Sequence, residues 1–309
     1  MSKRPPSRLP LYSDSDLNFI LPNFLISEFF YARSLEKDVI LGQDPEFNHQ
    51  YRVTLRRMRS LSLLLKELLP QFERKLLKPN LKLVMKKTNL LRDLDVFIMD
   101  KARYVTMLPE HKASLERMFT IIEDYQFEEQ QRVADWLTSR RYLSTSILIE
   151  NSLRRALRSE DQSEHIDPLS FANNKIVTQF RRVSKSITKI SDTSEDSDIH
   201  ALRIKCKSLR YLLECFSALY SKDQHKDNVK QLKLLQDKLG NFNDTSTQIA
   251  FFSRLRRASA KQKEDRKALK ALIKEIKNQH RQTRQTVVSD VKLFHQFLQE
   301  SSALDLYRV

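Results

Sequence analysis

Residues 49–69, HQYRVTLRRMRSLSLLLKELL, recur in altered form as residues 200–220, HALRIKCKSLRYLLECFSALY. The basic positions of the two segments match at one offset, because 200−49, 203−52, 207−56 and 210−59 are all 151. The same offset relates two later lysines and two later aspartates: Lys82 to Lys233, and Asp93 to Asp244. A constant offset over a block of this length predicts that one structural unit has been duplicated.

Each copy predicts an amphipathic helix with a stripe of cations. At about 100° per residue, positions spaced by 3, 7 and 10 fall within a wedge of about 80° on one helix face. The stripes are His49, Arg52, Arg56 and Arg59 in the first copy, and His200, Arg203, Lys207 and Arg210, with Tyr211, in the second. The opposite faces are apolar, with Met58, Leu61, Leu65 and Leu68 in one and Leu209, Leu212 and Phe216 in the other. Each helix therefore has one side to bury and a cationic side to present.

The cationic stripes favour a function over a merely solvated surface. Like charges at i and i+4 repel by a few tenths of a kcal/mol, as between Arg52 and Arg56. Solvated helix faces usually mix Glu with Lys, whereas here no acid occurs in the second stripe until Glu214, one turn beyond Arg210. Both stripes therefore predict a polyanionic ligand that relieves the repulsion.

The composition predicts an almost entirely helical, strongly basic protein. The 309 residues include only two glycines and nine prolines, and 55 Lys plus Arg face 39 Asp plus Glu, for a formal net charge of +16. This balance favours nucleic acid, phosphate polymers or an acidic membrane as partner. No apolar run follows the basic N-terminus as in a signal peptide, and none approaches the ~20 residues of a membrane span. With Cys206 and Cys215 expected as buried, reduced thiols, these features predict a cytoplasmic protein.

Helix-start, helix-stop and linker signals along the sequence predict two helical halves. We expect a flexible N-terminus at 1–13, a first helical repeat at 14–158, a linker at 159–168 and a second repeat at 169–309. In the first repeat we expect helices at 17–40 (kinked or restarted at Pro22), at 81–105 (broken near Asn89), at 109–136 and at 140–158. The repeated helix is expected to start with Asp44 as N-cap and Pro45 as its first residue, and residues 70–80 are expected to be a basic connection.

The second repeat is expected to follow the same plan. Its helices are predicted at 169–190, at 226–239 and at 264–299, in addition to the second signature helix. The acidic loop 191–198 is expected to supply the N-cap of that signature helix. Gly240 is expected to stop the helix that starts at 226, and Asp244 to cap the next one.

The combined motifs resemble one known family. H-x-x-R-x-x-x-[RK]-x-x-R followed by RDLDV (92–96), and then HALRIKCKSLRYLLE followed by LQDKLGNFND (235–244), are similar to the CHAD family, the conserved histidine α-helical domain, over about residues 17–298. The resemblance implies an all-α fold of two four-helix-bundle-like repeats, related by pseudo-two-fold symmetry around a basic central groove. It further implies binding of inorganic polyphosphate and an association with polyphosphate granules. Nothing in the chain corresponds to the CYTH triphosphatase domain often fused to this family, so the chain resembles a stand-alone member.

The resemblance carries the polyphosphate-binding role onto the matching basic residues. These are His49, Arg52, Arg56, Arg59 and Lys82 in the first half and His200, Arg203, Lys207, Arg210 and Lys233 in the second, with Lys86 secondary because its counterpart is Asp237. Arginine offers bidentate contacts to phosphate and lysine a mobile point charge, and the affinity should fall with salt. The histidines either add charge as the pH drops, orient neighbouring arginines, or simply cap the entrance to the helix. Asp93 and Asp244 are expected to be N-caps or partners of arginines. One departure is Asn89, where the family has a glycine.

Other function classes find less support. Two glycines leave no P-loop or Gly-rich phosphate loop, and no HExxH motif occurs. The histidines lie among Arg and Lys, which disfavours a metal cation. We therefore expect no catalytic residues, metal or cofactor.

The main alternative is a general RNA- or DNA-binding protein. The lack of a recognition motif and the few aromatic residues near the stripes argue against it. An adaptor at a granule surface would be compatible with polyphosphate binding. Basic patches without a repeat counterpart are interpreted as solvated surface: Arg154, Arg155 and Arg158, Arg181 and Arg182, and Arg254, Arg256 and Arg257.

Overall fold

The computed structural model describes residues 8–12, 14–158, 166–258, 262–300 and 302–308, and within these residues all regular secondary structure is helical, which confirms the all-α prediction. The first half holds α1 (Leu17–Ser34), α2 (Glu36–Leu41), α3 (Pro45–Leu64), α4 (Gln71–Lys87), α5 (Asn89–Met99), α6 (Lys101–Met107), α7 (Lys112–Thr138) and α8 (Arg140–Leu157). The second half holds α9 (Pro168–Ile187), α10 (Asp196–Cys215), α11 (Lys222–Ala258) and α12 (Lys263–Glu300). Short 3-10 turns are η1 (Lys66–Leu68), η2 (Pro109–His111), η3 (Ser217–Leu219) and η4 (Ser302–Tyr307).

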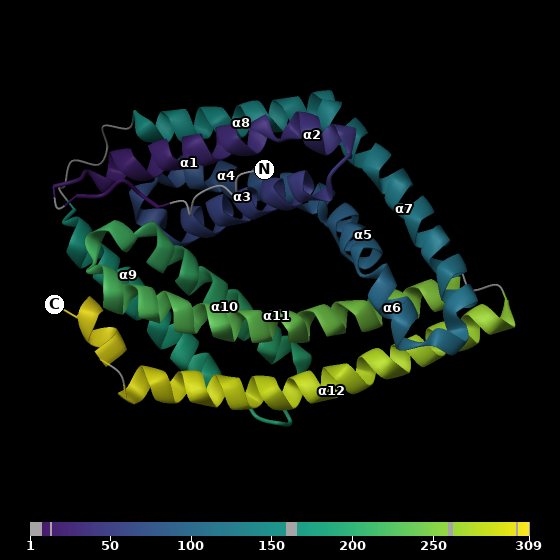
Figure 1. Cartoon of the computed structure of the whole chain (residues 1–309). Helices are drawn as coiled ribbons and strands as arrows, with labels where there is room; N and C mark the ends of the chain where they lie inside the picture. Colours follow the sequence, from purple (N-terminus) through teal and green to yellow (C-terminus); the bar gives the residue numbers. More distant parts are fainter. Residues whose placement is uncertain (1–7, 13, 159–165, 259–261, 301, 309) are drawn as a thin grey trace.

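The helices form two groups that share a core. Figure 1 shows α1, α2, α3, α4 and α8 in one group and α9 to α12 in the other, with α5, α6 and α7 leading from the first group to the far ends of α11 and α12. The main hydrophobic cluster takes residues from both groups, including Leu55 and Met58 of α3 and Leu209 of α10. A second cluster joins α5, α6 and α7 to α11 and α12, with Phe97 and Phe252 among its members. The signature helices α3 and α10 contact each other directly.

The helix boundaries follow the offset found in the sequence. The bounds of α3 and α10 differ by 196−45 and 215−64, both 151, as do the starts of α1 and α9, 168−17. α11 covers the span of α4, α5 and α6 in one helix, since 222−71 and 258−107 are also 151, and α12 starts where α7 would, 263−112. The two halves thus share boundaries but differ in where their helices are interrupted. The pseudo-two-fold relation between them stays a prediction.

The ends of the two signature helices follow local chemistry to different degrees. Asp44 caps α3 as predicted, because its side chain accepts from the backbone N of Glu46 at 2.8 Å and Pro45 is the first helical residue. Gly42, which ends α2, takes a left-handed φ of 65° that favours glycine. The acidic loop, in contrast, provides no side-chain cap: α10 begins at Asp196, and the preceding Glu195 makes no cap hydrogen bond.

Several predicted interruptions are wrong because packing overrides local signals. Residues 71–80 belong to α4 rather than to a connection, and the helix passes through Pro79 while Leu77 and Leu81 are buried on its other side. α1 likewise passes through Pro22, so the restart predicted there is wrong and comes later, at Leu35 between α1 and α2; the kink at Pro22 stays a prediction.

The corresponding error in the second half concerns a glycine and an aspartate. Gly240 does not stop a helix and Asp244 does not cap one, since both lie inside α11. Asp93 is also not an N-cap, because α5 starts four residues earlier at Asn89. The break predicted near Asn89 is confirmed, since α4 ends at Lys87 and α5 begins at Asn89.

The N-terminal segment expected to be flexible is partly packed on the core. Leu9 and Leu11 are buried, and the backbone N of Leu9 donates to the carbonyl of Cys215 at 3.1 Å. Apolar burial of these two leucines is the physical reason for the difference. Residues 1–7 and 13, and residues 159–165 of the expected linker, lie outside the described residues.

Two further expectations concern thiols and membranes. Cys206 and Cys215 are buried free cysteines, as predicted, and burial raises the pKa of Cys206 to about 12. Across the part of the chain that the structure describes, none of the helices combines the length and apolar character that crossing a bilayer requires.

Candidate functional site

The contact between α3 and α10 brings cations of the two stripes together. Arg56 of α3 acts electrostatically on both Arg203 and Lys207 of α10. Burial, reinforced by the charges of Arg203, Arg56 and Arg210, lowers the pKa of Lys207 to about 7, and Asp244 opposes this shift. Burial is also the main cause of the lowered pKa of Arg203, to which Arg56 adds. Cations separated by 151 positions in sequence therefore share one electrostatic environment.

The second stripe opens into a hollow of about 380 Å³ between α10 and α11. Its lining consists of Arg203, Lys207, Arg210, Gln236, Asp237, Gly240, Asn241 and Asp244. The Nε atom of Arg203 is buried without a hydrogen-bond partner among the described residues. Arg210 lies 3.6 Å from Glu214 and over the ring of Tyr211, 5.7 Å from its centroid. The hollow thus presents cationic donors to any anion that enters it.

Arg52, the first-half counterpart of Arg203, is placed differently. It is only 7% exposed, and its Nη1 donates to the carbonyl of Met85 at 3.2 Å, to Thr88 Oγ1 at 3.1 Å and to Asn89 Oδ1 at 2.6 Å. These acceptors lie at the interruption between α4 and α5. Burial, followed by the charge of Arg56, lowers the pKa of Arg52 to about 10, so it stays protonated at neutral pH. Arg52 therefore holds the break between two helices.

The two signature histidines differ in environment. His49 is half-buried, and burial together with the charge of Arg92 lowers its pKa, so it is mostly uncharged at neutral pH. His200 is exposed, and its Nδ1 lies 2.5 Å from Oδ1 of Asn243. Because the amide oxygen accepts, Nδ1 carries the proton of this bond. His200 is thus oriented by α11, while its Nε2 remains available to a ligand.

The remaining predicted residues lie on or beside the stripes. Arg59 is half-buried on α3, and its Nε lacks a hydrogen-bond partner within the described chain. Lys82 and Lys86 are exposed on α4, which packs on α3, and Lys233 is exposed on α11, which packs on α10. Within the described ranges, no hydrogen bond or ion pair joins these three lysines to a stripe residue. The structure therefore brings Arg56, Arg203, Lys207 and Arg210 together and leaves the three lysines on flanking helices.

Asp93 and Asp244 act as electrostatic partners of the arginines. Asp93 raises the pKa of Arg52 and Asp244 raises that of Arg203, in each case against the larger effect of burial. The two aspartates also act on each other, and Arg254 of α11 acts on Asp93. Among the described residues, no three His, Cys, Asp or Glu side chains are grouped so as to hold a metal ion.

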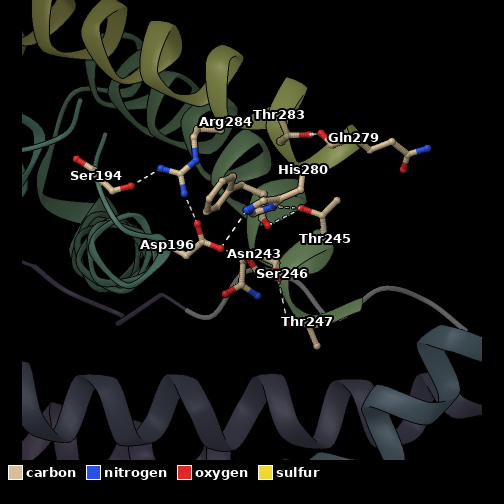
Figure 2. A network of polar contacts seen from close by, with 11 residues as sticks. Ser194, Asp196, Asn243, Thr245, Ser246, Thr247, Gln279, His280, Thr283 and Arg284 are labelled. Carbon is tan, nitrogen blue, oxygen red and sulfur yellow. Dashed lines mark hydrogen bonds and ion pairs between the residues drawn. The ribbon is translucent and has the colours of Figure 1, made fainter. Parts of the chain in front are cut away.

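A polar network that sequence reasoning missed fixes the start of α10. Figure 2 shows Asp196 between side chains of α11 and α12. His280 Nε2 lies 3.0 Å from Asp196 Oδ2, which also accepts from Ser246 Oγ at 2.8 Å, and His280 Nδ1 lies 2.7 Å from Thr245 Oγ1. Arg284 donates to both the carboxylate of Asp196 and the carbonyl of Ser194.

This network anchors the start of α10 to α11 and α12. Burial alone would raise the pKa of Asp196, but the hydrogen bond from Ser246 and the charges of His280 and Arg284 lower it. The carboxylate therefore stays ionised and ties the first turn of α10, one turn before His200, to two other helices. Its only sequence signal was the acidic loop, because its partners lie about 50 to 90 positions further along the chain.

Comparison with known proteins agrees with this architecture. Residues 31–253 match the family described as the CHAD domain. The chain belongs to the CHAD domain family. Its fold is similar to the crystal structure of the CHAD domain from the plant Ricinus communis, with a TM-score of 0.77 at 21% identity over 94% of this chain and 97% of that chain. PptA from Streptomyces chartreusis is also similar, with a TM-score of 0.67 at 15% identity over 90% of this chain and 98% of that chain.

The CHAD match includes both signature helices. It begins in α1 and ends in α11, so α3 and α10 lie inside it, whereas α12 lies beyond it. At these identities the two solved structures support the CHAD fold and not a particular ligand. No curated protein matches the chain.

Proposed function

We propose that this CHAD domain binds inorganic polyphosphate between the stripes of α3 and α10. The observation that carries the proposal is the position of Arg56, whose charge reaches Arg203 and Lys207 of the other half. Holding like charges together in a partly desolvated place is unfavourable unless a counter-charge enters. A chain of phosphates supplies that counter-charge at many successive points.

The proposed role of each residue in binding polyphosphate follows from its position in the structure. Arg56, Arg59, Arg203 and Arg210 would donate to phosphate oxygens, and Lys207 would gain a full charge when an anion raises its pKa. Binding is therefore expected to take up a proton near neutral pH. Arg52 would position α4 and α5 rather than contact the ligand, and the exposed lysines Lys82, Lys86 and Lys233 would extend the field along the chain. We propose binding without turnover, in the cytoplasm and at polyphosphate granules.

Nucleic acid is the second candidate, because the net charge of +16 suits it equally. Single-stranded nucleic acid is usually held by aromatic side chains on which bases stack. The lining of the hollow has no aromatic side chain, and Tyr211 beside it is buried. These features favour a ligand recognised by its phosphates alone.

A competition titration tests the proposal. Labelled long-chain polyphosphate is challenged with single-stranded RNA, duplex DNA and orthophosphate at two salt concentrations. The variants are Arg203→Ala/Lys207→Ala and, as a charge-matched control, Lys185→Ala/Lys189→Ala at the exposed end of α9. We expect polyphosphate to win at the higher salt for the wild type and the control, and to lose that advantage in the stripe variant. Equal competition by RNA or DNA in the wild type would reduce the site to a generic cationic surface.

A further inference from the structure

A second cationic hollow lies at the end of the α11–α12 pair, apart from the stripes. It measures about 460 Å³, and the described residues that line it are all basic: Arg256, Arg257, Lys263, Arg266, Lys267 and Lys270. The four α12 residues are spaced by 3, 4 and 7 positions, which places them on one helix face. We call these six residues the hairpin-end cluster. Six cations around one hollow repel one another unless an anion is present.

Five of the six cations of the cluster are not neutralised by the described residues of the protein. Apart from Arg266, its members have no ion pair or side-chain hydrogen bond within the described ranges. The buried Asp265 is engaged elsewhere, since it accepts from Arg117 of α7 at 2.7 Å. Glu264 is exposed in the same turn but does not line the hollow. The positive charge of the five cations other than Arg266 is therefore available to a ligand.

The cluster is mounted on a packed scaffold. On the inward face of α12, Ala268, Leu269 and Leu272 are buried in the second hydrophobic cluster, with Phe252 and Leu255 of α11. Their packing fixes the backbone from which the cations project. A fixed scaffold lowers the ordering that binding requires, because only side-chain ends must still be immobilised.

The cluster is also not a product of the duplication. At the offset of 151, Lys263 corresponds to the basic Lys112 of α7, but Arg266, Lys267 and Lys270 correspond to Leu115, Glu116 and Phe119, which are apolar or acidic. The second half therefore carries a cationic feature that the first half lacks. This asymmetry argues for a local purpose rather than for inheritance from the repeated unit.

The cluster lies along the same helix as the stripe hollow. Asp244 lines that hollow and Arg257 lines the second one, 13 residues later on α11, which corresponds to about 20 Å of helix. Between them Arg254 acts on Asp93, which in turn acts on Arg52 of the first stripe. At about 100° per residue these 13 positions turn the helix by about 220°, so the two hollows open on different faces of α11, and only a polyanion long enough to wrap around the helix can reach both.

We propose that the hairpin-end cluster is a second polyanion site that takes phosphates of a condensed phosphate chain. Among the described residues, the lining contains no aromatic side chain to stack on a base and no apolar side chain to enter a lipid layer, so phosphate oxygens are the groups that it recognises. The inference rests on the proposed function of the stripes. A long chain that occupies both hollows gains affinity from the tether between them, whereas a short one fills each hollow separately.

The test uses tripolyphosphate, long-chain polyphosphate and single-stranded RNA in calorimetric titrations of the full chain. The variants are Arg257→Ala/Lys263→Ala/Lys267→Ala in the cluster, Arg203→Ala/Lys207→Ala in the stripe, and the charge-matched control Arg181→Ala/Arg182→Ala/Lys185→Ala on the exposed face of α9. We expect two tripolyphosphates per wild-type or control chain and one for either site variant. The cluster variant should also lose about tenfold or more of its affinity for the long chain.

The other outcomes separate the two proposals. If the cluster variant keeps the wild-type stoichiometry and long-chain affinity while the stripe variant loses both, the second site is refuted and the proposed function stands. If the control loses as much as the cluster variant, the effect is a general field and the site is refuted. A loss confined to single-stranded RNA would also overturn it, in favour of nucleic acid. If the wild type binds neither phosphate, both proposals fall.

Discussion

Arg52 and Arg203 occupy the same position in the two copies of the signature helix, yet their surroundings differ. Arg52 is buried and donates three hydrogen bonds across the break between α4 and α5. Arg203 lines an open hollow and makes no hydrogen bond or ion pair within the described chain, although the Nε of both arginines lacks a partner there. One copy of the arginine thus holds the fold together, while the other is free to meet an anion.

The difference originates in the helix that follows. In the first half the chain is interrupted at Thr88, so the carbonyl of Met85 and the side chain of Asn89 can accept from Arg52. In the second half α11 runs through Gly240 without a break, and the carbonyls there remain in the helix ladder. Arg203 therefore finds no freed acceptor. Duplicated residues can keep their spacing and still divide structural and binding roles between them.

The largest expected effect is on the free energy of unfolding, which should distinguish the structural role of Arg52 from the binding role of Arg203. Arg52→Ala should lower the free energy of unfolding by about 3 kcal/mol, because it removes a charged donor from buried acceptors. Arg203→Ala should change it by less than about 0.5 kcal/mol, since the side chain has less to lose. Urea unfolding followed by circular dichroism measures both. Similar losses in the two variants would show that the arginines play the same part, and the comparison would fail.

The affinity for polyphosphate should show the opposite order, because the substitution at Arg203 should weaken binding more than the substitution at Arg52. Arg203→Ala should weaken polyphosphate binding about tenfold, the effect of losing roughly one charge-assisted hydrogen bond. Arg52→Ala, titrated at a temperature where it remains folded, should weaken binding by less than about threefold. Fluorescence titration with labelled polyphosphate, alongside a circular dichroism spectrum of each variant, measures this. An Arg52 variant that is fully folded and binds as poorly as the Arg203 variant would make both arginines ligands.

Much of the fold was predictable because its signals are local. The 3.6-residue period revealed the two signature helices and their buried faces, and Asp44 with Pro45 marked a helix start that the structure confirms. The break near Asn89 was likewise predicted, although it forms without a left-handed residue, since Thr88 at the break has a φ of −107°. These features depend on residues within a few turns of one another.

The remaining features depend on contacts that no local pattern contains. Pro79 and Gly240 are helix breakers by propensity, yet packing of α4 on α3 and of α11 on α12 keeps both inside helices. The buried orientation of the Arg52 side chain depends on hydrogen-bond acceptors more than 30 positions away in the sequence. The link between Asp196 and Arg284 spans 88 positions. A stripe in the sequence therefore predicted a set of cations but not which of them face a ligand.

The pH dependence of stability sharpens the comparison at Lys207. Its pKa falls from 10.5 to about 7 on folding, so between pH 7 and about 10 the unfolded chain binds more protons than the native one. This contribution to stability is therefore least favourable below pH 7 and improves as the pH rises. We expect the melting temperature to rise by about 4 °C between pH 7 and 9 from this group. Calorimetry should show the rise in wild type but not in Lys207→Met or with saturating polyphosphate; a rise that persists in Lys207→Met would assign it to another group.

The smallest expected effect on the free energy of unfolding concerns Asn89 and Gly240, which occupy equivalent positions in the two halves. The helix is interrupted at Asn89 and continuous at Gly240. A Cβ at Gly240 meets no atom within 4 Å, and α11 is continuous there, so Gly240→Ala should raise the free energy of unfolding by about 0.5–1 kcal/mol through helix propensity. Asn89→Ala should instead lower it by about 1 kcal/mol, because Arg52 loses its closest acceptor, at 2.6 Å. Opposite signs in urea unfolding would show that the first half needs its interruption and the second does not. If Gly240→Ala destabilises the protein, the fold needs a glycine at this position even though the helix is continuous. The contrast between a broken and a continuous helix would then no longer explain why Arg52 and Arg203 differ.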